Sequence, residues 1–166
     1  MLIFVIAAVL YAIDQGIKAA VVASMSLGQT VPVLGEVLQL RYLQNSGAAF
    51  SSFSGYTWAL TLVALGVIAF VIWFARRIRS VVWGVVFGFV LGGALGNATD
   101  RFIRPPGAGQ GSVVDYLQVW GFPAVFNIAD VWVCTAAALF LILTFRGVRL
   151  DGTRIPPRPA AGSPAT

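Results

Sequence analysis

The chain contains no histidine and a single cysteine, Cys134. Without histidine it lacks the usual general base, the commonest metal ligand and the base of a Ser-His or Cys-His nucleophile pair. One cysteine cannot form a disulfide within the chain or a multi-cysteine metal site, and its apolar neighbours predict a small core side chain. Any catalysis must therefore depend on carboxylates, hydroxyls or Lys18, and we expect no metal or cofactor.

Charged residues are also scarce, at 10% of the 166 residues, whereas about 25% is usual for a soluble domain. Hydrophobic residues make up 58% of the chain, and the mean hydropathy is +0.87. This composition predicts an integral membrane protein and excludes a large soluble domain. The net charge of +5 does not indicate a nucleic-acid partner, because the basic residues are spread over helix ends and the C-terminal region instead of forming one stripe.

Four apolar segments are long enough to cross a membrane as helices. The first is expected over residues 1–22 and contains Asp14 and Lys18 near one end. The other three segments are Tyr56–Phe74, Val81–Gly96 and Ile128–Phe145. We therefore predict an all-α membrane protein with four transmembrane helices, formed by residues 1–150.

The positions of the basic residues predict the orientation of these helices, since cytoplasmic loops are enriched in Lys and Arg. Seven arginines flank one end of the helices: Arg76, Arg77, Arg79, Arg146, Arg149, Arg154 and Arg158. Four basic residues flank the other end: Lys18, Arg41, Arg101 and Arg104. Both termini are therefore expected in the cytoplasm, with five of the six acidic residues at the outer face. The segment 151–166, rich in Pro, Gly, Ala and Ser, is expected to be a disordered cytoplasmic tail.

The two connections at the outer face are long and carry patterns of their own. In the first, Leu38, Leu40 and Tyr42 alternate with polar residues, which predicts a strand in a small extracytoplasmic β-sheet. The second connection contains aromatic residues typical of a membrane interface: Tyr116, Trp120 and Phe122. We expect this second connection to be an interfacial loop that lies along the membrane surface.

Two carboxylates of the outer face could act together in catalysis. Asp115 lies between apolar neighbours, which disfavour its ionised form, and Asp130 lies at the start of the fourth helix. If the outer connection folds back, the two carboxyl groups can meet and share one proton, a known way to activate water at a peptide bond. Asn127 and Asp130 also fit a helix N-cap with an acidic partner three residues later, so a purely structural role stays open.

Other polar residues admit both structural and functional interpretations. Asp14 and Lys18 lie four residues apart on one helical face, which favours an ion pair, although Lys18 could also serve as the base of a Ser-Lys protease. Asn97 could cap the third helix, and Asp100 could pair with a nearby arginine. The segment Asn45–Phe50 could bind an extended peptide or form a turn.

Five stretches of the chain together resemble the signal peptidase II family of bacterial membrane proteases. They are Asp14-Gln15-x-x-Lys18, Asn45-Ser46-Gly47-Ala48-Ala49-Phe50, Gly92-Gly93-Ala94-Leu95-Gly96-Asn97-x-x-Asp100-Arg101, Val113-Val114-Asp115-Tyr116 and Phe126-Asn127-x-Ala129-Asp130. The stretches follow the order of the family and cover nearly everything except the tail. The resemblance implies an aspartic endopeptidase of the bacterial inner membrane. Such an enzyme removes the signal peptide from prolipoproteins, cutting just before a cysteine that carries diacylglycerol.

The same resemblance implies roles for individual residues and ligands. Asp115 and Asp130 match the catalytic dyad. Four residues are expected to line the substrate site, namely Asn45, Asn97, Arg101 and Asn127, and three are expected to support it, namely Asp14, Lys18 and Asp100. The expected partners are lipidated prolipoproteins, membrane lipid and globomycin-type cyclic peptide inhibitors. The segment 104–111 departs from the family as a longer loop that is rich in Pro and Gly.

Two functions from other classes also use polar residues within a membrane. A small transporter or channel would need them along its pathway, but here the carboxylates cluster at one face and no inverted repeat is visible. A structural subunit would use them to hold helices together, which leaves the two Asn-x-x-Asp stretches and Asp115 on one side unexplained. The small residues of Gly92–Gly96 predict close helix packing and not a phosphate site.

Overall fold

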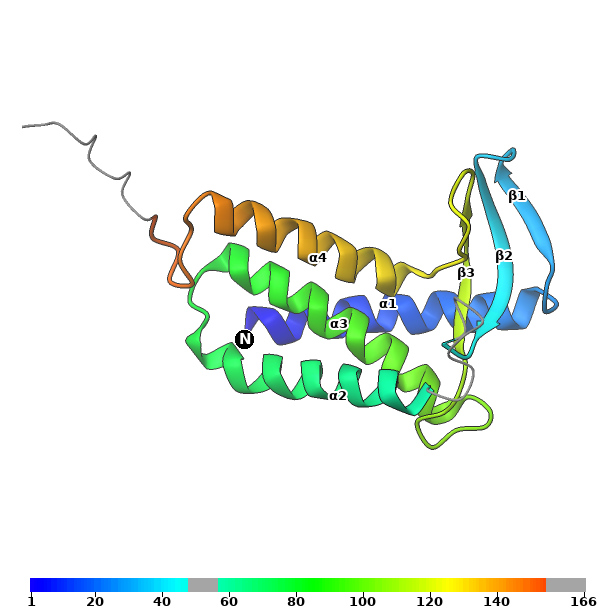
Figure 1. Cartoon of the computed structure of the whole chain (residues 1–166), viewed down its shortest axis with the longest axis horizontal. Helices are drawn as coiled ribbons and strands as arrows, with labels where there is room; N and C mark the ends of the chain where they lie inside the picture. Colours follow the sequence, from blue (N-terminus) through cyan, green and yellow to red (C-terminus); the bar gives the residue numbers. More distant parts are fainter. Residues whose placement is uncertain (48–56, 155–166) are drawn as a thin grey trace, which may run out of the picture.

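The structure is a computed structural model that describes residues 1–47 and 57–154. Within these residues, four helices run roughly along the long axis, and a small sheet lies at the end opposite the N-terminus (Figure 1). The helices are α1 (Leu2–Ser24), α2 (Thr57–Phe74), α3 (Val81–Ile103) and α4 (Ile128–Phe145), and a short 3-10 helix, η1 (Ala75–Arg77), follows α2. The strands are β1 (Thr30–Leu34), β2 (Leu38–Asn45) and β3 (Val113–Val119). All four α-helices are long and apolar enough to cross a membrane, as predicted.

Three of the helices match their predicted bounds within two residues, whereas α3 continues for seven residues beyond its predicted end at Gly96. Asn97, Asp100 and Arg101 therefore lie in the last two turns of α3. The expectation that Asn97 caps this helix is wrong, because the C-cap is Arg104. The helix continues through Asn97 and Asp100 because their side chains bond to α1, β3 and α4 instead of competing for the backbone of α3.

Helix α3 lies at the centre of the bundle and packs closely against α1 and α4. A Cβ atom on Gly92 would lie 2.9 Å from the Cβ of Leu10 in α1. A Cβ atom on Gly93 would lie 2.7 Å from the main-chain oxygen of Ala129 in α4. These approaches are too short for any side chain, which confirms the prediction of close helix packing here. They also bring the polar end of α3 against Asp14 of α1 and against the start of α4.

The outward faces of the helices carry apolar side chains, as expected where lipid replaces water. Val63 of α2 and Phe140 and Phe145 of α4 are among these exposed residues. Cys134 is also exposed on α4, so the prediction of a core cysteine is wrong. An apolar sequence cannot distinguish the two faces of a membrane helix, because both the core and the lipid select apolar residues.

The strands form one antiparallel sheet in the order β1-β2-β3. Strand β2 confirms the strand predicted around Leu38–Tyr42, but β3 replaces part of the expected interfacial loop. Residues 113–116 are all buried, so β3 lacks the polar–apolar alternation that identifies a strand with one exposed face. A continuous buried run of this length does not by itself distinguish a strand from a loop or a helix.

The sheet is fixed to the end of α1 by a small apolar cluster. Its buried members are Val21, Tyr42, Val114 and Tyr116. Tyr116 is thus a core residue, which corrects its predicted place at the membrane interface. Trp120 and Phe122, which follow β3, are exposed as that prediction requires.

At the opposite end of the bundle, residues 147–154 fold back over the connection between α2 and α3. The main-chain N–H groups of Arg79 and Ser80 donate hydrogen bonds of 3.1 and 2.9 Å to the Leu150 oxygen. Val148 also pairs with Arg154 in an isolated antiparallel bridge. Residues 151–154 of the predicted tail therefore form a turn. The rest of the tail, 155–166, lies outside the described residues, as does the Ala48–Phe50 part of the candidate peptide-binding segment.

Candidate active site

Asp115 is positioned by β3 and by its neighbour β2. It pairs with Leu43 in the register of the two strands, and Asn45 pairs with Val113 two residues away. The Asn45 Nδ2 atom donates a hydrogen bond of 2.8 Å to Asp115 Oδ2. Asp115 is only 2% exposed. The sheet thus holds one of the two candidate catalytic carboxyl groups in a buried position beside Asn45.

Asp130 is brought to the same place by the short connection between β3 and α4. Phe126 pairs with Leu117 of β3 through two main-chain hydrogen bonds, of 2.7 and 3.0 Å. Helix α4 then begins at Ile128, with Asn127 at its N-cap. This return of the chain places the first turn of α4, including Asp130, against β3.

Asn127 connects the two carboxyl groups. Its Nδ2 atom donates a hydrogen bond of 2.7 Å to Asp115 Oδ1, and its main-chain N–H donates one of 3.1 Å to Asp130 Oδ2. Its Oδ1 atom accepts a bond of 3.2 Å from the main-chain N–H of Asp130, which completes a capping box. The capping interpretation is therefore confirmed. It does not compete with a catalytic role, since the residue that caps α4 also places Asp115 and Asp130 around one point.

Asn97 approaches Asp130 from the last turns of α3. Its Nδ2 atom donates a hydrogen bond of 2.8 Å to Asp130 Oδ1, and its Oδ1 atom accepts one of 2.9 Å from Lys18 Nζ. A lysine ammonium group can only donate, so this bond determines which end of the Asn97 amide faces Asp130. Asp130 itself is half-buried, and of the two carboxylates it is the more open to a ligand.

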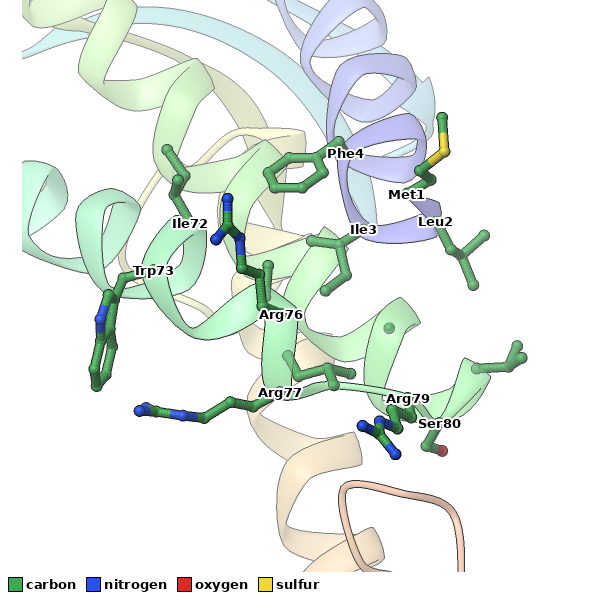
Figure 2. A pocket seen from close by; sticks show the side chains of 14 residues that line it. Met1, Leu2, Ile3, Phe4, Ile72, Trp73, Arg76, Arg77, Arg79 and Ser80 are labelled. Atoms are coloured by element: carbon green, nitrogen blue, oxygen red, sulfur yellow. The ribbon is translucent and has the colours of Figure 1, made fainter.

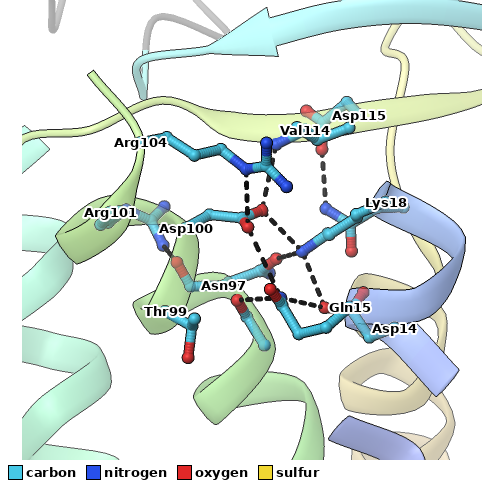
Figure 3. Close-up of polar contacts among 12 residues, drawn as sticks. Asp14, Gln15, Lys18, Asn97, Thr99, Asp100, Arg101, Arg104, Val114 and Asp115 are labelled. Carbon is cyan, nitrogen blue, oxygen red and sulfur yellow. Dashed lines mark hydrogen bonds and ion pairs between the residues drawn. The ribbon is translucent and has the colours of Figure 1, made fainter. Parts of the chain in front are cut away.

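Beneath these residues lies an ion-pair cluster that joins α1 to α3 (Figure 3). Lys18 Nζ lies 2.9 Å from Asp14 Oδ2 and 2.9 Å from Asp100 Oδ2, and all three side chains are fully buried. Arg104 Nε lies 2.9 Å from Asp100 Oδ1. The predicted pairs of Asp14 with Lys18 and of Asp100 with an arginine are both confirmed. Asp100 also accepts a bond of 3.2 Å from the Val114 N–H, which ties β3 to α3.

Arg101 has donor groups that the described residues do not fully use. Its Nη1 atom donates a hydrogen bond of 3.2 Å to the main-chain oxygen of Asn97. Its Nε atom is buried and has no hydrogen-bond partner within residues 1–47 and 57–154. The Arg101 side chain is bound to the backbone of Asn97, the residue whose amide binds Asp130. A cationic donor in this position is suited to an acceptor group on a ligand.

The surroundings of the two carboxyl groups favour different charge states. Burial raises the pKa of Asp115 to about 6, against the opposing effect of the hydrogen bonds from Asn127 and Asn45. This is the direction expected from its apolar neighbours. Asp130 lies in the first turn of α4, where the helix dipole favours a negative charge. Two carboxyl groups whose environments differ in this way suit an acid and a base.

Several residues that build the site were given no role in it by the sequence analysis. Gln15 donates hydrogen bonds of 3.1 Å to Asp14 Oδ2 and to the Gly96 main-chain oxygen, but glutamines are common on helix surfaces. The Tyr116 hydroxyl accepts a bond of 3.3 Å from the Ile128 N–H, and burial raises the pKa of this phenol. In the 104–111 loop, the Gly109 oxygen accepts a bond from Thr61 of α2, which holds the loop against the bundle.

The protein has four membrane-spanning helices, no histidine in its sequence, and two carboxyl groups that both accept hydrogen bonds from Asn127. These are the features of a membrane-embedded aspartic protease. The model of the family described as signal peptidase (SPase) II matches residues 6–146. The chain belongs to the signal peptidase II family, and it is a bacterial multi-pass membrane protein with aspartic endopeptidase activity.

Individual relatives agree with this assignment. The lipoprotein signal peptidase of Leifsonia xyli subsp. xyli is 50% identical over 150 residues, which cover 90% of this chain and 69% of the relative. That of Rhodococcus jostii is 47% identical over 154 residues, covering 93% of this chain and 77% of the relative. A solved bacterial membrane enzyme, determined in meso at 1.9 Å resolution, superposes with a TM-score of 0.76 and 25% identity, covering 87% of this chain and 92% of the other.

Proposed function

We propose that Asp115 and Asp130 are the catalytic dyad of this signal peptidase. The observation that carries the proposal is the pair of hydrogen bonds from Asn127, one to each carboxyl group. Two carboxyl groups that share one proton can activate water without a metal, a histidine or a nucleophilic serine. One short connection joins β3, which carries Asp115, to α4, which carries Asp130. This connection limits how far apart the two carboxyl groups can lie.

In this mechanism Asp130 is the base and Asp115 is the acid. The ionised carboxylate of Asp130 takes a proton from water while the water oxygen attacks the carbonyl carbon of the scissile bond. The protonated carboxyl group of Asp115 donates its proton to the carbonyl oxygen, giving a neutral tetrahedral diol. When this intermediate collapses, the proton held by Asp130 moves to the leaving nitrogen, the C–N bond breaks, and a diol proton returns to Asp115.

The enzyme removes the signal peptide from prolipoproteins, and the cut falls just before the diacylglyceryl-modified cysteine. Four residues around the dyad line the substrate site: Asn45, Asn97, Arg101 and Asn127. The unused Nε donor of Arg101 is suited to a carbonyl of the bound peptide. Three buried residues support them from α1 and α3, namely Asp14, Lys18 and Asp100. Globomycin-type cyclic peptides bind at the same carboxylates and inhibit cleavage.

Cleavage is expected to depend strongly on the lipid of the substrate. The half-buried Asp130 lies at the start of a membrane-spanning helix, so the substrate reaches it from the bilayer. Acyl chains hold the substrate there with about 0.8 kcal/mol per buried CH₂ group. Purified protein should therefore cleave a lipidated precursor far faster than its unlipidated form when both are tested in bilayers of the same composition. Equal rates for the two precursors would contradict the proposed substrate, whereas no cleavage of either would contradict the dyad.

The dyad lies at the extracytoplasmic face, and both termini lie in the cytoplasm. Support comes from six arginines at the end of the bundle that holds the N-terminus: Arg76, Arg77, Arg79, Arg146, Arg149 and Arg154. Asp115 lies in β3 and Asp130 in the first turn of α4, and Figure 1 shows the sheet and the start of α4 at the other end.

This orientation can be tested by labelling single cysteines in a Cys134→Ala background. A cysteine at Gln110 should react with an impermeant thiol reagent in intact cells, whereas a cysteine at Arg79 should react only after permeabilisation. The background substitution is needed because Cys134 is itself exposed on α4. The reverse labelling pattern would overturn the orientation.

The rate of cleavage should depend on pH as expected for a coupled pair of carboxyl groups. Because burial raises the pKa of Asp115 to about 6, its proton is present below that pH and is lost above it. Activity should therefore decrease as the pH rises through the upper apparent pKa and should also decrease in acid, when both groups are protonated. We expect this profile from kcat/KM measured on lipidated substrate with a chelator present. Loss of activity with the chelator and its recovery on adding a divalent metal would refute an aspartic mechanism.

A further inference from the structure

A cavity of about 810 Å³ lies at the end of the bundle opposite the carboxylates. It is enclosed by the start of α1, the end of α2 with η1, and the start of α3 (Figure 2). Its volume falls within the range of about 300–1,000 Å³ that is usual for small-molecule sites. None of the residues assigned to the proposed active site lines it, so the cavity requires a separate explanation.

The walls of the cavity are apolar where they face the middle of the membrane. Ile3 and Phe4 contribute from α1, and Ile72 contributes from α2. Phe4 and Ile72 are also exposed, over 45% and 51% of their surfaces. Because these two helices lie in the membrane, a hollow between their ends opens toward lipid acyl chains.

The rim of the cavity carries three arginines: Arg76, Arg77 and Arg79. Figure 2 shows the Arg76 side chain extending between Ile72 of α2 and Phe4 of α1. The Arg77 guanidinium stacks on Trp73, 4.1 Å from the ring centroid. Within residues 1–47 and 57–154 none of the three arginines forms an ion pair, since all the ion pairs found there lie at the other end of the bundle. The rim therefore offers two guanidinium groups, those of Arg76 and Arg79, that are engaged neither in ion pairs nor in stacking.

A second hollow, of about 690 Å³, lies next to the first. The same three arginines line it together with Arg149, and Asp151 is its one acidic lining residue. The hydroxyl and main-chain N–H of Thr153 bind the Asp151 carboxylate, so this acid is already engaged. Positive charge thus exceeds negative charge around the rim. This excess favours the binding of an anionic ligand.

We propose that this cavity binds one anionic phospholipid. The headgroup phosphate binds Arg79 and Arg76. To reach it, the Arg76 side chain turns out from between Ile72 and Phe4, and an acyl chain takes that space against Ile3, Phe4 and Ile72. The planar guanidinium group presents paired N–H donors that match phosphate oxygens, and the apolar walls match a hydrocarbon chain. A free phosphate ion would satisfy the arginines only, whereas the lipid satisfies both parts of the cavity.

The proposal can be tested by native mass spectrometry of the full chain in detergent, titrated with phosphatidylglycerol or with phosphatidylcholine of the same acyl chains. One basic residue beside an anionic headgroup contributes a factor of about five to binding. Wild-type protein should therefore bind phosphatidylglycerol roughly twentyfold more tightly, and the R76Q/R79Q variant should bind the two lipids alike. The control is Arg146→Gln, which removes one positive charge at the same end of the bundle from a residue that lines neither hollow. It should change the affinity less than about twofold.

A second variant tests the cavity separately from the charge. Ala75→Trp fills the hollow beside the arginines and leaves their charges in place, so it should weaken phosphatidylglycerol binding while the protein stays monodisperse. Unchanged binding by this variant would place the lipid elsewhere and overturn the proposal. An equal loss in the Arg146→Gln control would do the same, because it would indicate general surface charge. Displacement of the lipid by inorganic phosphate would assign the site to a free anion, and lipid-free dimers would assign it to a second copy of the chain.

Discussion

Replacing Asp130 with asparagine is expected to lower kcat for prolipoprotein cleavage by about 10²–10⁴-fold, the range for loss of a general base. The amide has almost the same shape but cannot take a proton from water. Both carboxylate oxygens accept hydrogen bonds, one from Asn97 and one from Asn127, so the new NH₂ group faces a donor. This mismatch should cost about 1 kcal/mol of stability, or roughly 3 °C in Tm. Asp115→Asn should have a similar effect on kcat, measured on the same lipidated substrate.

The controls for this prediction separate catalysis from helix capping. Glu36→Gln removes a carboxylate from the exposed hairpin between β1 and β2, at the same end of the molecule, and should leave kcat unchanged. Asn127→Ser keeps a residue that caps helices well but removes the amide that binds Asp115. It should therefore lower Tm by only a few degrees, through the lost bond to buried Asp115, and still lower kcat as strongly as the loss of a carboxylate. Near-normal turnover in Asp130→Asn would mean that Asp130 serves only the capping box.

Composition and charge were sufficient to predict the membrane-spanning helices. An apolar run bounded by polar or small residues is a local signal, and the bounds of α2 and α4 follow from it almost residue by residue. The capping box of Asn127 and Asp130 is also local, because its two partners are three residues apart. The extension of α3 past Gly96 was not predicted, since it depends on bonds from Asn97 and Asp100 to other elements.

The candidate site shows the same division between local and distant information. The Asp14–Lys18 pair is visible in the sequence as a four-residue spacing on one helix. The bond from Lys18 to Asn97 joins residues 79 positions apart, and no pattern in a single sequence indicates it. Strand β3 was not predicted from the sequence for a related reason. It is buried by contacts with β2 and α1 that are distant in sequence, so Tyr116 looked like an interfacial aromatic.

The buried ion-pair cluster is expected to be the largest single contribution of side-chain charge to stability. Asp14 and Asp100 both lie within 2.9 Å of Lys18 Nζ, and neither carboxylate is exposed. Arg104 compensates Asp100 in part, but Asp14 forms no other ion pair within residues 1–47 and 57–154. Removing one partner of a buried pair leaves an uncompensated charge, which typically costs about 3–5 kcal/mol. Lys18 also orients the Asn97 amide toward Asp130, so its loss should affect the dyad as well.

Lys18→Met should therefore lower the Tm of the detergent-solubilised protein by on the order of 10 °C, and it should lower kcat more than it changes KM. The methionine side chain has a similar length and no charge, so the change tests the ammonium group and not the packing.

Asp14→Asn alone should reduce Tm less, because Lys18 keeps Asp100 as a partner. The double variant D14N/K18M should be more stable than Lys18→Met, since no uncompensated carboxylate then remains at position 14. Arg146→Met, on the exposed surface beyond α4, provides the control for loss of a positive charge. A Tm for Lys18→Met within 2–3 °C of the wild-type value, the effect of only about 1 kcal/mol, would show that the buried cluster is not what holds α1 against α3.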